Sequence, residues 1–308
     1  MIGKYPISDE FKPYSEFIMP INRFSISMLR IFMRVPAFFL KDPDAKIQKH
    51  RITSFDGKKI ELYIITPNGI KEPAPCMFNF HGGGFILDGA KHHYQLALRY
   101  AKEMGCKVVY VRYRLAPKHK FPVPFEDAYS ALCWVYDNAA QLGIDKKNIG
   151  VGGDSAGGTI SAGLCLMARD RNHPVKFKFQ MLAYPFLDGR CSSRSSKKFT
   201  DTPMWNSERS KAITPLFMPD HTIKNAVYAS PVQAKSLENL PLAYIETAEF
   251  DSLHDDGILY SKRLRRFGVN TELNETKGTM HGFDICYDAP ITQEAISRRI
   301  KFMQKHFA

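Results

Sequence analysis

The sequence alternates between two kinds of pattern from about residue 50 to its end, and this alternation limits the folds open to it. Short runs rich in β-branched and aromatic residues predict strands at 59–66, 75–80, 107–112, 148–153, 178–185, 241–247 and 271–276. Longer patterns between several of them predict helices at 92–104, 125–141, 156–170, 252–267 and 291–306. Strands that alternate with helices favour an α/β fold, in which helices cover both faces of a mostly parallel sheet. We expect one such domain over residues 1–308.

The composition and the charge pattern indicate a globular protein that does not bind nucleic acid. The 308 residues are 44% hydrophobic and 24% charged, which is ordinary for a soluble globular chain with a large core. The net charge of +12 comes from scattered basic runs such as SSRSSKK, SKRLRR and SRRIK, which we interpret as solvated faces. Because no module that reads nucleic acid accompanies these runs, we expect no nucleic-acid partner.

Cysteine usage indicates a reducing compartment. The six cysteines form no C-x-x-C pair and match no zinc spacing, and they stand at positions 76, 106, 133, 165, 191 and 286. No secretory h-region follows Met1, and no H-E-x-x-H pattern offers a pair of metal ligands. We therefore expect a cytoplasmic protein without a metal site.

Two segments do not follow the alternation of strands and helices, and the first is residues 1–45. Its apolar residues recur at the spacing of an amphipathic helix, at Phe24, Met28, Ile31 and Val35, while three arginines share another face, at Arg23, Arg30 and Arg34. A membrane span needs about 20 mostly apolar residues, and these arginines interrupt the run. We expect the apolar face to pack on the protein's own core, with a helix on a membrane surface as the alternative.

The second such segment is residues 186–228, which are polar at first and then aromatic. Insertions of this length in compact α/β domains are often lids over an active site. We expect 1–45 and 186–228 together to form a helical cap over the carboxyl ends of the strands.

The stretch VGGDSAGGTI, residues 151–160, joins a predicted strand to a predicted helix and reads G-x-S-x-G from Gly153 to Gly157. This motif places a serine at the apex of a sharp strand-to-helix turn, where its neighbours leave no room for side chains. The alternative is a glycine-rich turn that binds phosphate, but neither G-x-x-x-x-G-K-[ST] nor G-x-G-x-x-G occurs here. Ser155 is therefore the candidate nucleophile.

A second glycine-rich stretch, HGGGF, follows the predicted strand 75–80 and begins at His81. Successive glycines leave backbone N–H groups uncovered, so they can face a developing oxyanion. Together with the N–H of Ala156, directly after the serine, they would form an oxyanion hole. The alternative is a flexible loop without a binding role.

HGGGF, YRLAPKHKFP and GDSAGG occur in this order, and together they resemble the hormone-sensitive lipase-like esterases of the α/β-hydrolase superfamily over about residues 50–305. The resemblance implies an α/β-hydrolase fold and hydrolysis of small or short-acyl carboxylic esters without a cofactor. It also implies an oxyanion hole built from Gly83, Gly84 and Ala156, with His81 orienting the loop.

The acid of a catalytic triad follows the serine in this fold, and the histidine comes last. In AEFDSLHDDG, Asp251 matches the family's D-P-L-x-D-[DE] pattern, although Ser252 stands where proline is common. Glu249 is a rival acid, and Asp251 could instead cap the helix that follows it.

The candidate histidine is His281, in KGTMHGF, which resembles the family's H-G-F and lies between the last strand and the final helix. With it, the expected mechanism is complete. His281 takes the proton of Ser155, and Asp251 orients the imidazole while an acyl-enzyme forms and is hydrolysed.

Bulky apolar residues near this site predict an apolar substrate pocket, and we expect it to include Phe24, Met28, Phe85, Trp205 and Phe217. Amide hydrolysis or deacetylation would use the same triad. A non-catalytic receptor is the alternative from another class, because the plant gibberellin receptors resemble this family but lack the catalytic histidine. Association with a membrane is not expected, and the sequence leaves the physiological ester and a homodimer open.

Overall fold

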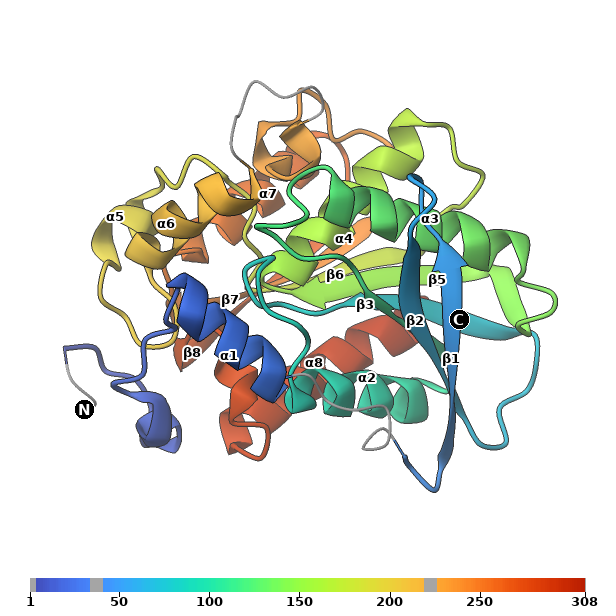
Figure 1. Cartoon of the computed structure of the whole chain (residues 1–308), viewed down its shortest axis with the longest axis horizontal. Coiled ribbons are helices and arrows are strands. Elements are labelled where there is room, and N and C mark those ends of the chain that lie inside the picture. The colour runs from blue at the N-terminus through green and yellow to red at the C-terminus, as the bar shows by residue number, and fades with distance from the viewer. Residues whose placement is uncertain (1–3, 34–40, 219–225, 308) are drawn as a thin grey trace.

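A computed structural model describes residues 4–33, 41–218 and 226–307 of the chain, and Figure 1 shows its central sheet with helices on both sides. The eight strands are ordered β1-β2-β4-β3-β5-β6-β7-β8 across the sheet. Their bounds are Ala45–Thr53, Lys59–Pro67, Ala74–Phe80, Lys107–Arg112, Ile144–Asp154, Phe179–Ala183, Leu242–Phe250 and Thr271–Met280, for β1 to β8 in turn. Only the pairs β1–β2 and β2–β4 are antiparallel within this described sheet, so the predicted mostly parallel sheet is confirmed.

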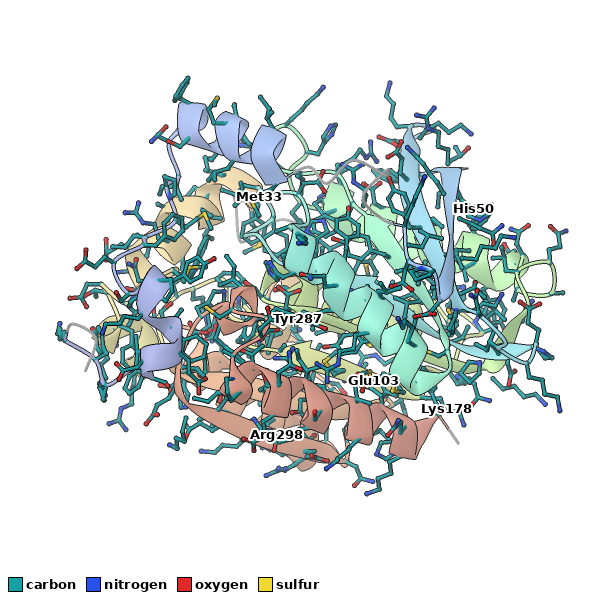
Figure 2. All side chains as sticks on the ribbon, turned by 90° about the horizontal axis from the view of Figure 1, so that it is seen from below. Met33, His50, Glu103, Lys178, Tyr287 and Arg298 are labelled. Carbon is teal, nitrogen blue, oxygen red and sulfur yellow. The ribbon has the colours of Figure 1, made fainter. Side chains whose placement is uncertain are left out.

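Helices cover the two faces of the sheet, and buried apolar side chains pack between the sheet and these helices. One face carries α2 (Lys91–Met104) and α8 (Pro290–His306), which lie side by side in Figure 2. The other carries α3 (Val123–Asp137), α4 (Ala156–Asp170) and α7 (His254–Arg266), as Figure 1 shows. Because packed helices close both faces of the sheet, the loops at the carboxyl ends of the strands are held on a rigid frame.

Each predicted strand and helix corresponds to an observed element within a few residues. The strand β1 was not predicted. Its sequence, AKIQKHRIT, carries mainly polar side chains, and most of them are exposed or half-buried on this edge of the sheet. An edge strand that buries few residues shows no clear apolar run, which is why the pattern missed it.

Among the described residues, the segments outside the alternation include the α-helices α1 (Arg23–Met33), α5 (Arg194–Lys198) and α6 (Ser207–Phe217). They lie together at one end of the molecule in Figure 1. The chain before α1 is tied to the segment before α6, because the N–H of Met19 donates to the carbonyl of Met204 over 3.0 Å. Residues 34–40 and 219–225 of the expected cap lie outside the described residues.

The predicted orientation of the N-terminal helix is wrong. Phe24 and Ile31 are 76% and 69% exposed, and Met28 is exposed as well, while Ile26 on another face is buried. Arg30 explains the difference, because its guanidinium donates to the carbonyl of Ile86, over 2.6 Å, and to that of Ala116. Two loop carbonyls thus bind Arg30, and the face that carries Phe24, Met28 and Ile31 points to solvent. Val35 and Arg34 lie outside the described residues.

One of the basic runs also differs from its interpretation as a solvated face. In SRRIK on α8, Arg298 is half-exposed, but Arg299 is 1% exposed and lies between the carboxylates of Glu246 and Asp284. None of the helices within residues 4–33, 41–218 and 226–307 has the length and the apolar character that a membrane span requires.

Candidate active site

The turn between β5 and α4 holds Ser155 in a conformation that side chains rarely adopt, with φ +51° and ψ −118°. Its N–H donates to the carbonyl of Ala183 over 2.9 Å, which fixes the turn to the neighbouring strand. A Cβ on Gly157 would lie 2.0 Å from the carbonyl oxygen of Phe80, so only glycine allows α4 to start this close to β3. Strain of this kind is typical of functional sites, where it exposes one side chain in a fixed direction.

Three side chains that are far apart in the sequence meet at this turn. Ser155 Oγ lies 2.8 Å from His281 Nε2, and His281 Nδ1 lies 2.7 Å from Asp251 Oδ2. All three residues are buried. Within such a site, a histidine between a hydroxyl and a carboxylate can take the hydroxyl proton while the carboxylate stabilises the imidazolium.

Asp251 does not cap a helix, which was the alternative interpretation. Its Oδ1 accepts from the N–H of Leu253 over 2.9 Å, while α7 begins only at His254. The rival acid, Glu249, accepts from the N–H of Gly278 over 2.8 Å and lies beside Lys277. Asp251 is therefore the carboxylate that reaches the imidazole.

The glycines after β3 leave two backbone N–H groups beside the serine. Gly83 and Gly84 have φ values of +106° and +60°, and no described residue accepts a hydrogen bond from either N–H. The N–H of Ala156 belongs to the first turn of α4, where helical N–H groups have no partner within the helix. This set of donors can bind an oxyanion that forms next to Ser155.

His81, at the start of this loop, is fully buried and does not reach the reacting atoms. Its ring stacks on that of Tyr113, with centroids 4.5 Å apart, and the Tyr113 hydroxyl donates to the His81 carbonyl over 2.7 Å. Burial lowers the pKa of His81 to about 4, so the ring is neutral at neutral pH. These contacts fix the direction in which the glycines leave β3.

Asp154, which sequence reasoning missed, ties the serine turn to the glycine loop. Its Oδ1 accepts from the N–H of Gly82 over 3.1 Å, and its Oδ2 lies 3.2 Å from His93 Nε2. Burial alone would raise the pKa of Asp154, but His93 and its histidine neighbours lower it to about 2. The position of Asp154 directly before the serine in the motif could have indicated a role in the site. Its partner on α2, His93, could not be identified from the sequence.

A small apolar pocket of about 10 Å³ opens beside Ser155 and Ala156. Phe85, Phe217 and Trp205, three of the residues expected in a substrate pocket, line it together with other residues of α6. Phe24 and Met28, predicted to line the same pocket, do not, because the face of α1 that carries them points to solvent.

A second cavity, of about 80 Å³, also reaches Ser155 and shares Gly84 and Trp205 with the small pocket. Its wall includes His281 and Gly282 at one side and the glycine loop at another, and Met19 and Met33 from the N-terminal segment close part of it. The site therefore consists of a tight apolar pocket and a larger cavity that meet at Ser155.

No group of three or more histidine, cysteine or acidic side chains that could hold a metal ion occurs among residues 4–33, 41–218 and 226–307. The sequence prediction that the reaction needs no cofactor stays a prediction. The six cysteines are free, and those at positions 76, 106 and 165 are buried.

Asp256, in the first turn of α7, is a buried acid that should influence how stability depends on pH. Burial and the nearby Asp188 carboxylate raise its pKa well above the ordinary value. The stability that the Asp256 carboxyl group contributes is therefore complete below its unfolded pKa of about 4. It is lost as the pH rises through the higher pKa of the folded state. We expect Asp256→Asn, which keeps an acceptor for the Asp188 N–H, to gain unfolding free energy relative to wild type from about pH 5 to about pH 8.

Asp255→Asn is the matched control, because replacing this neighbouring acid should lower the free energy of unfolding instead of raising it. Burial alone would raise the pKa of Asp255, but His254 and the N–H of Ser195 lower it. Its stabilisation is present above the unfolded pKa, so the variant should lose stability relative to wild type over the same range. Urea unfolding at both pH values measures the two differences. An Asp256→Asn difference that does not grow with pH would contradict this assignment.

Comparisons with known proteins identify the family and agree with the fold. A family model described as "alpha/beta hydrolase fold" matches residues 77–285 of the chain. Carboxylesterase NlhH of Mycobacterium tuberculosis is 35% identical over 270 residues, which are 85% of this chain and 83% of that protein.

Solved structures are similar over almost the whole chain. Esterase LipW from Mycobacterium marinum superposes with a TM-score of 0.90 at 28% identity, covering 98% of this chain and 96% of its own. A bacterial heroin esterase gives a TM-score of 0.88 at 29% identity and covers 98% of both chains.

Proposed function

Because this chain belongs to the α/β-hydrolase family and is a carboxylesterase of its hormone-sensitive lipase-like group, we propose that it hydrolyses short-acyl esters through Ser155, His281 and Asp251. The observation that carries the proposal is the 2.8 Å contact between Ser155 Oγ and His281 Nε2. A serine hydroxyl is a weak nucleophile until a base stands at this distance.

The proposed reaction has two halves. Ser155 Oγ attacks the ester carbonyl carbon while His281 Nε2 takes its proton, and the oxyanion is held by the N–H groups of Gly83, Gly84 and Ala156. His281 then gives the proton to the departing alkoxide, which leaves as an alcohol. Water attacks the acyl-enzyme with His281 again as base, and the acid is released as Ser155 recovers its proton.

The acyl group is proposed to enter the small pocket lined by Phe85, Trp205 and Phe217. Its volume of about 10 Å³ is that of roughly one water molecule, so it matches an acetyl methyl better than a long chain. Gly84 also lines this pocket, and a Cβ added there would lie 2.7 Å from the Trp205 ring. The rigid aromatic walls therefore favour short acyl groups.

Residues 1–45 and 186–228 are proposed to act as a cap on a single domain. Ser210, Ile213 and Phe217 on α6 reach the acyl pocket, and Met19 and Met33 reach the larger cavity. These contacts of both segments with the two cavities support the proposed cap.

A series of p-nitrophenyl esters from acetate to palmitate tests the proposal. We expect kcat/KM to be highest for acetate or butyrate and to fall by about 10-fold or more at octanoate, since each misplaced methylene in a rigid apolar pocket costs about that factor. An anilide of acetic acid in the same series separates ester from amide hydrolysis. Equal rates for acetate and palmitate would contradict the pocket assignment, and no turnover of any ester would contradict the proposed function.

A further inference from the structure

The larger cavity is the side of the site from which the alcohol should leave. His281 must protonate the departing oxygen, and its ring lines this cavity but not the small apolar pocket. The walls are mainly apolar and include Met19, Met33, Leu87 and Met204. Any polar side chain in such a wall should have a partner or a function, because an unpaired polar group is costly to desolvate.

Most polar side chains in this wall have such a partner. Asp154 and His93 lie 3.2 Å apart, and His281 lies between Ser155 and Asp251. Tyr184 packs its ring edge-on against His281, with centroids 5.1 Å apart. These groups either react with the ester or hold the reacting groups in place, so they are not left to recognise the alcohol.

His92, in the first turn of α2, differs from them. Its ring contacts that of His93, with centroids 3.9 Å apart, but it forms no hydrogen bond with any described residue. The side chain is half-buried and lines the cavity. Burial lowers the pKa of His92 well below its ordinary value, so at neutral pH the ring offers one donor and one acceptor.

We propose that His92 determines leaving-group specificity by hydrogen bonding to a hydroxyl group on the alcohol part of the ester. This inference rests on the proposed function and names its substrate class, which is short-acyl esters of hydroxylated alcohols. A hydroxyl group both donates and accepts, and so matches a neutral imidazole. An apolar alcohol of the same size would instead cover the ring nitrogens and leave them unpaired, which adds to the discrimination.

Pairs of acetates with equal numbers of heavy atoms test this role. The pairs are 2-hydroxyethyl and propyl acetate, 3-hydroxypropyl and butyl acetate, and 4-hydroxybutyl and pentyl acetate. For each enzyme variant, kcat/KM for the hydroxylated ester is divided by that for the alkyl ester. This ratio cancels both a general loss of rate and, when variants are compared, the intrinsic reactivity of the esters.

We expect His92→Leu and His92→Phe to lower the ratio by about 3- to 10-fold at one or more chain lengths, which is the effect of one neutral hydrogen bond. Two different replacements guard against a variant that fails to fold. His92→Gln keeps a donor and an acceptor and should recover part of the ratio, which a merely structural role would not predict. Lys91→Leu is the matched control on the same turn, exposed and outside the cavity wall, and should leave the ratio unchanged.

Ratios that are the same in wild type and in both His92 variants at all three lengths would overturn the inference while ester hydrolysis itself stands. Failure of the wild-type protein to turn over any acetate would instead contradict the proposed function. The two failures are therefore distinguishable in one set of assays.

Discussion

Replacing Ser155 by alanine should lower kcat/KM for p-nitrophenyl acetate by about 10⁴-fold or more, because the variant keeps the oxyanion donors but has no nucleophile. The residual rate should come from these N–H groups and from binding alone. The fold should persist, since Ser155 is held by its backbone, whose N–H donates to Ala183 over 2.9 Å. Initial rates and far-UV circular dichroism of the two proteins measure both expectations.

Ser161→Ala provides the matched control on the same helix. Ser161 is also fully buried, but its hydroxyl donates to the carbonyl of Gly157 over 2.8 Å and does not reach His281. We expect its kcat/KM to stay within about tenfold of wild type, because at most one intrahelical hydrogen bond is lost. If Ser155→Ala kept even a tenth of the activity, another residue would have to be the nucleophile.

Labelling with a fluorophosphonate gives an independent measure of the same role. The reagent phosphonylates an activated serine as fluoride leaves, and the adduct should be found by mass spectrometry on the peptide that contains Ser155. Ser155→Ala should carry no adduct.

Local patterns predicted the sheet and its helices, because these depend on short-range chemistry, whereas the residues that meet at Ser155 were predicted from motifs that resemble those of the esterase family. Periodicity identifies a buried strand or helix wherever one face is apolar, and glycines mark turns that no other residue can form. The motif around Ser155 also carries its own geometry, namely a strand, a sharp turn and a helix. His281 could be identified because its place in chain order between the last strand and the last helix is fixed by the fold.

Contacts between distant segments that no family motif marks were not predictable from the sequence. Nothing around His93 indicates that it faces Asp154, since the two stand on different elements and share no periodic pattern. The orientation of α1 was wrong for the same reason, because Arg30 binds the carbonyls of Ile86 and Ala116, which only the folded chain brings near. Phe24 and Met28 were assigned to the pocket on that orientation.

The buried Arg299 forms another long-range contact that the sequence did not predict, since its run was interpreted as a solvated face. Its Nη1 lies 2.7 Å from Asp284 Oδ2, its Nη2 also binds Glu246, and all three side chains are inaccessible to solvent. Glu246 lies on β7, the strand that leads to Asp251, and Asp284 comes three residues after His281. Arg299 therefore joins the two segments that hold the acid and the base of the site.

Arg299→Met should lower the free energy of unfolding by about 3–5 kcal/mol, because it leaves two buried carboxylates without their cation. Arg299→Lys keeps the charge and should recover part of the loss. Arg298→Met is the matched control on the same helix, where the half-exposed pair with Glu294, at 2.7 Å, should contribute less than about 1 kcal/mol. Urea unfolding of the four proteins measures these differences.

The dependence on pH separates lost charge pairing from lost packing. Burial raises the pKa of Asp284 even beside Arg299, and removing the cation should raise it further. A raised carboxyl pKa gives stability that is present at low pH and lost as the pH rises, so the deficit of Arg299→Met should be larger at about pH 8 than at about pH 5. A deficit that is constant with pH would mean that Arg299 stabilises the protein through packing alone. A deficit under about 1 kcal/mol would mean that the segments carrying Asp251 and His281 hold their geometry without this ion cluster.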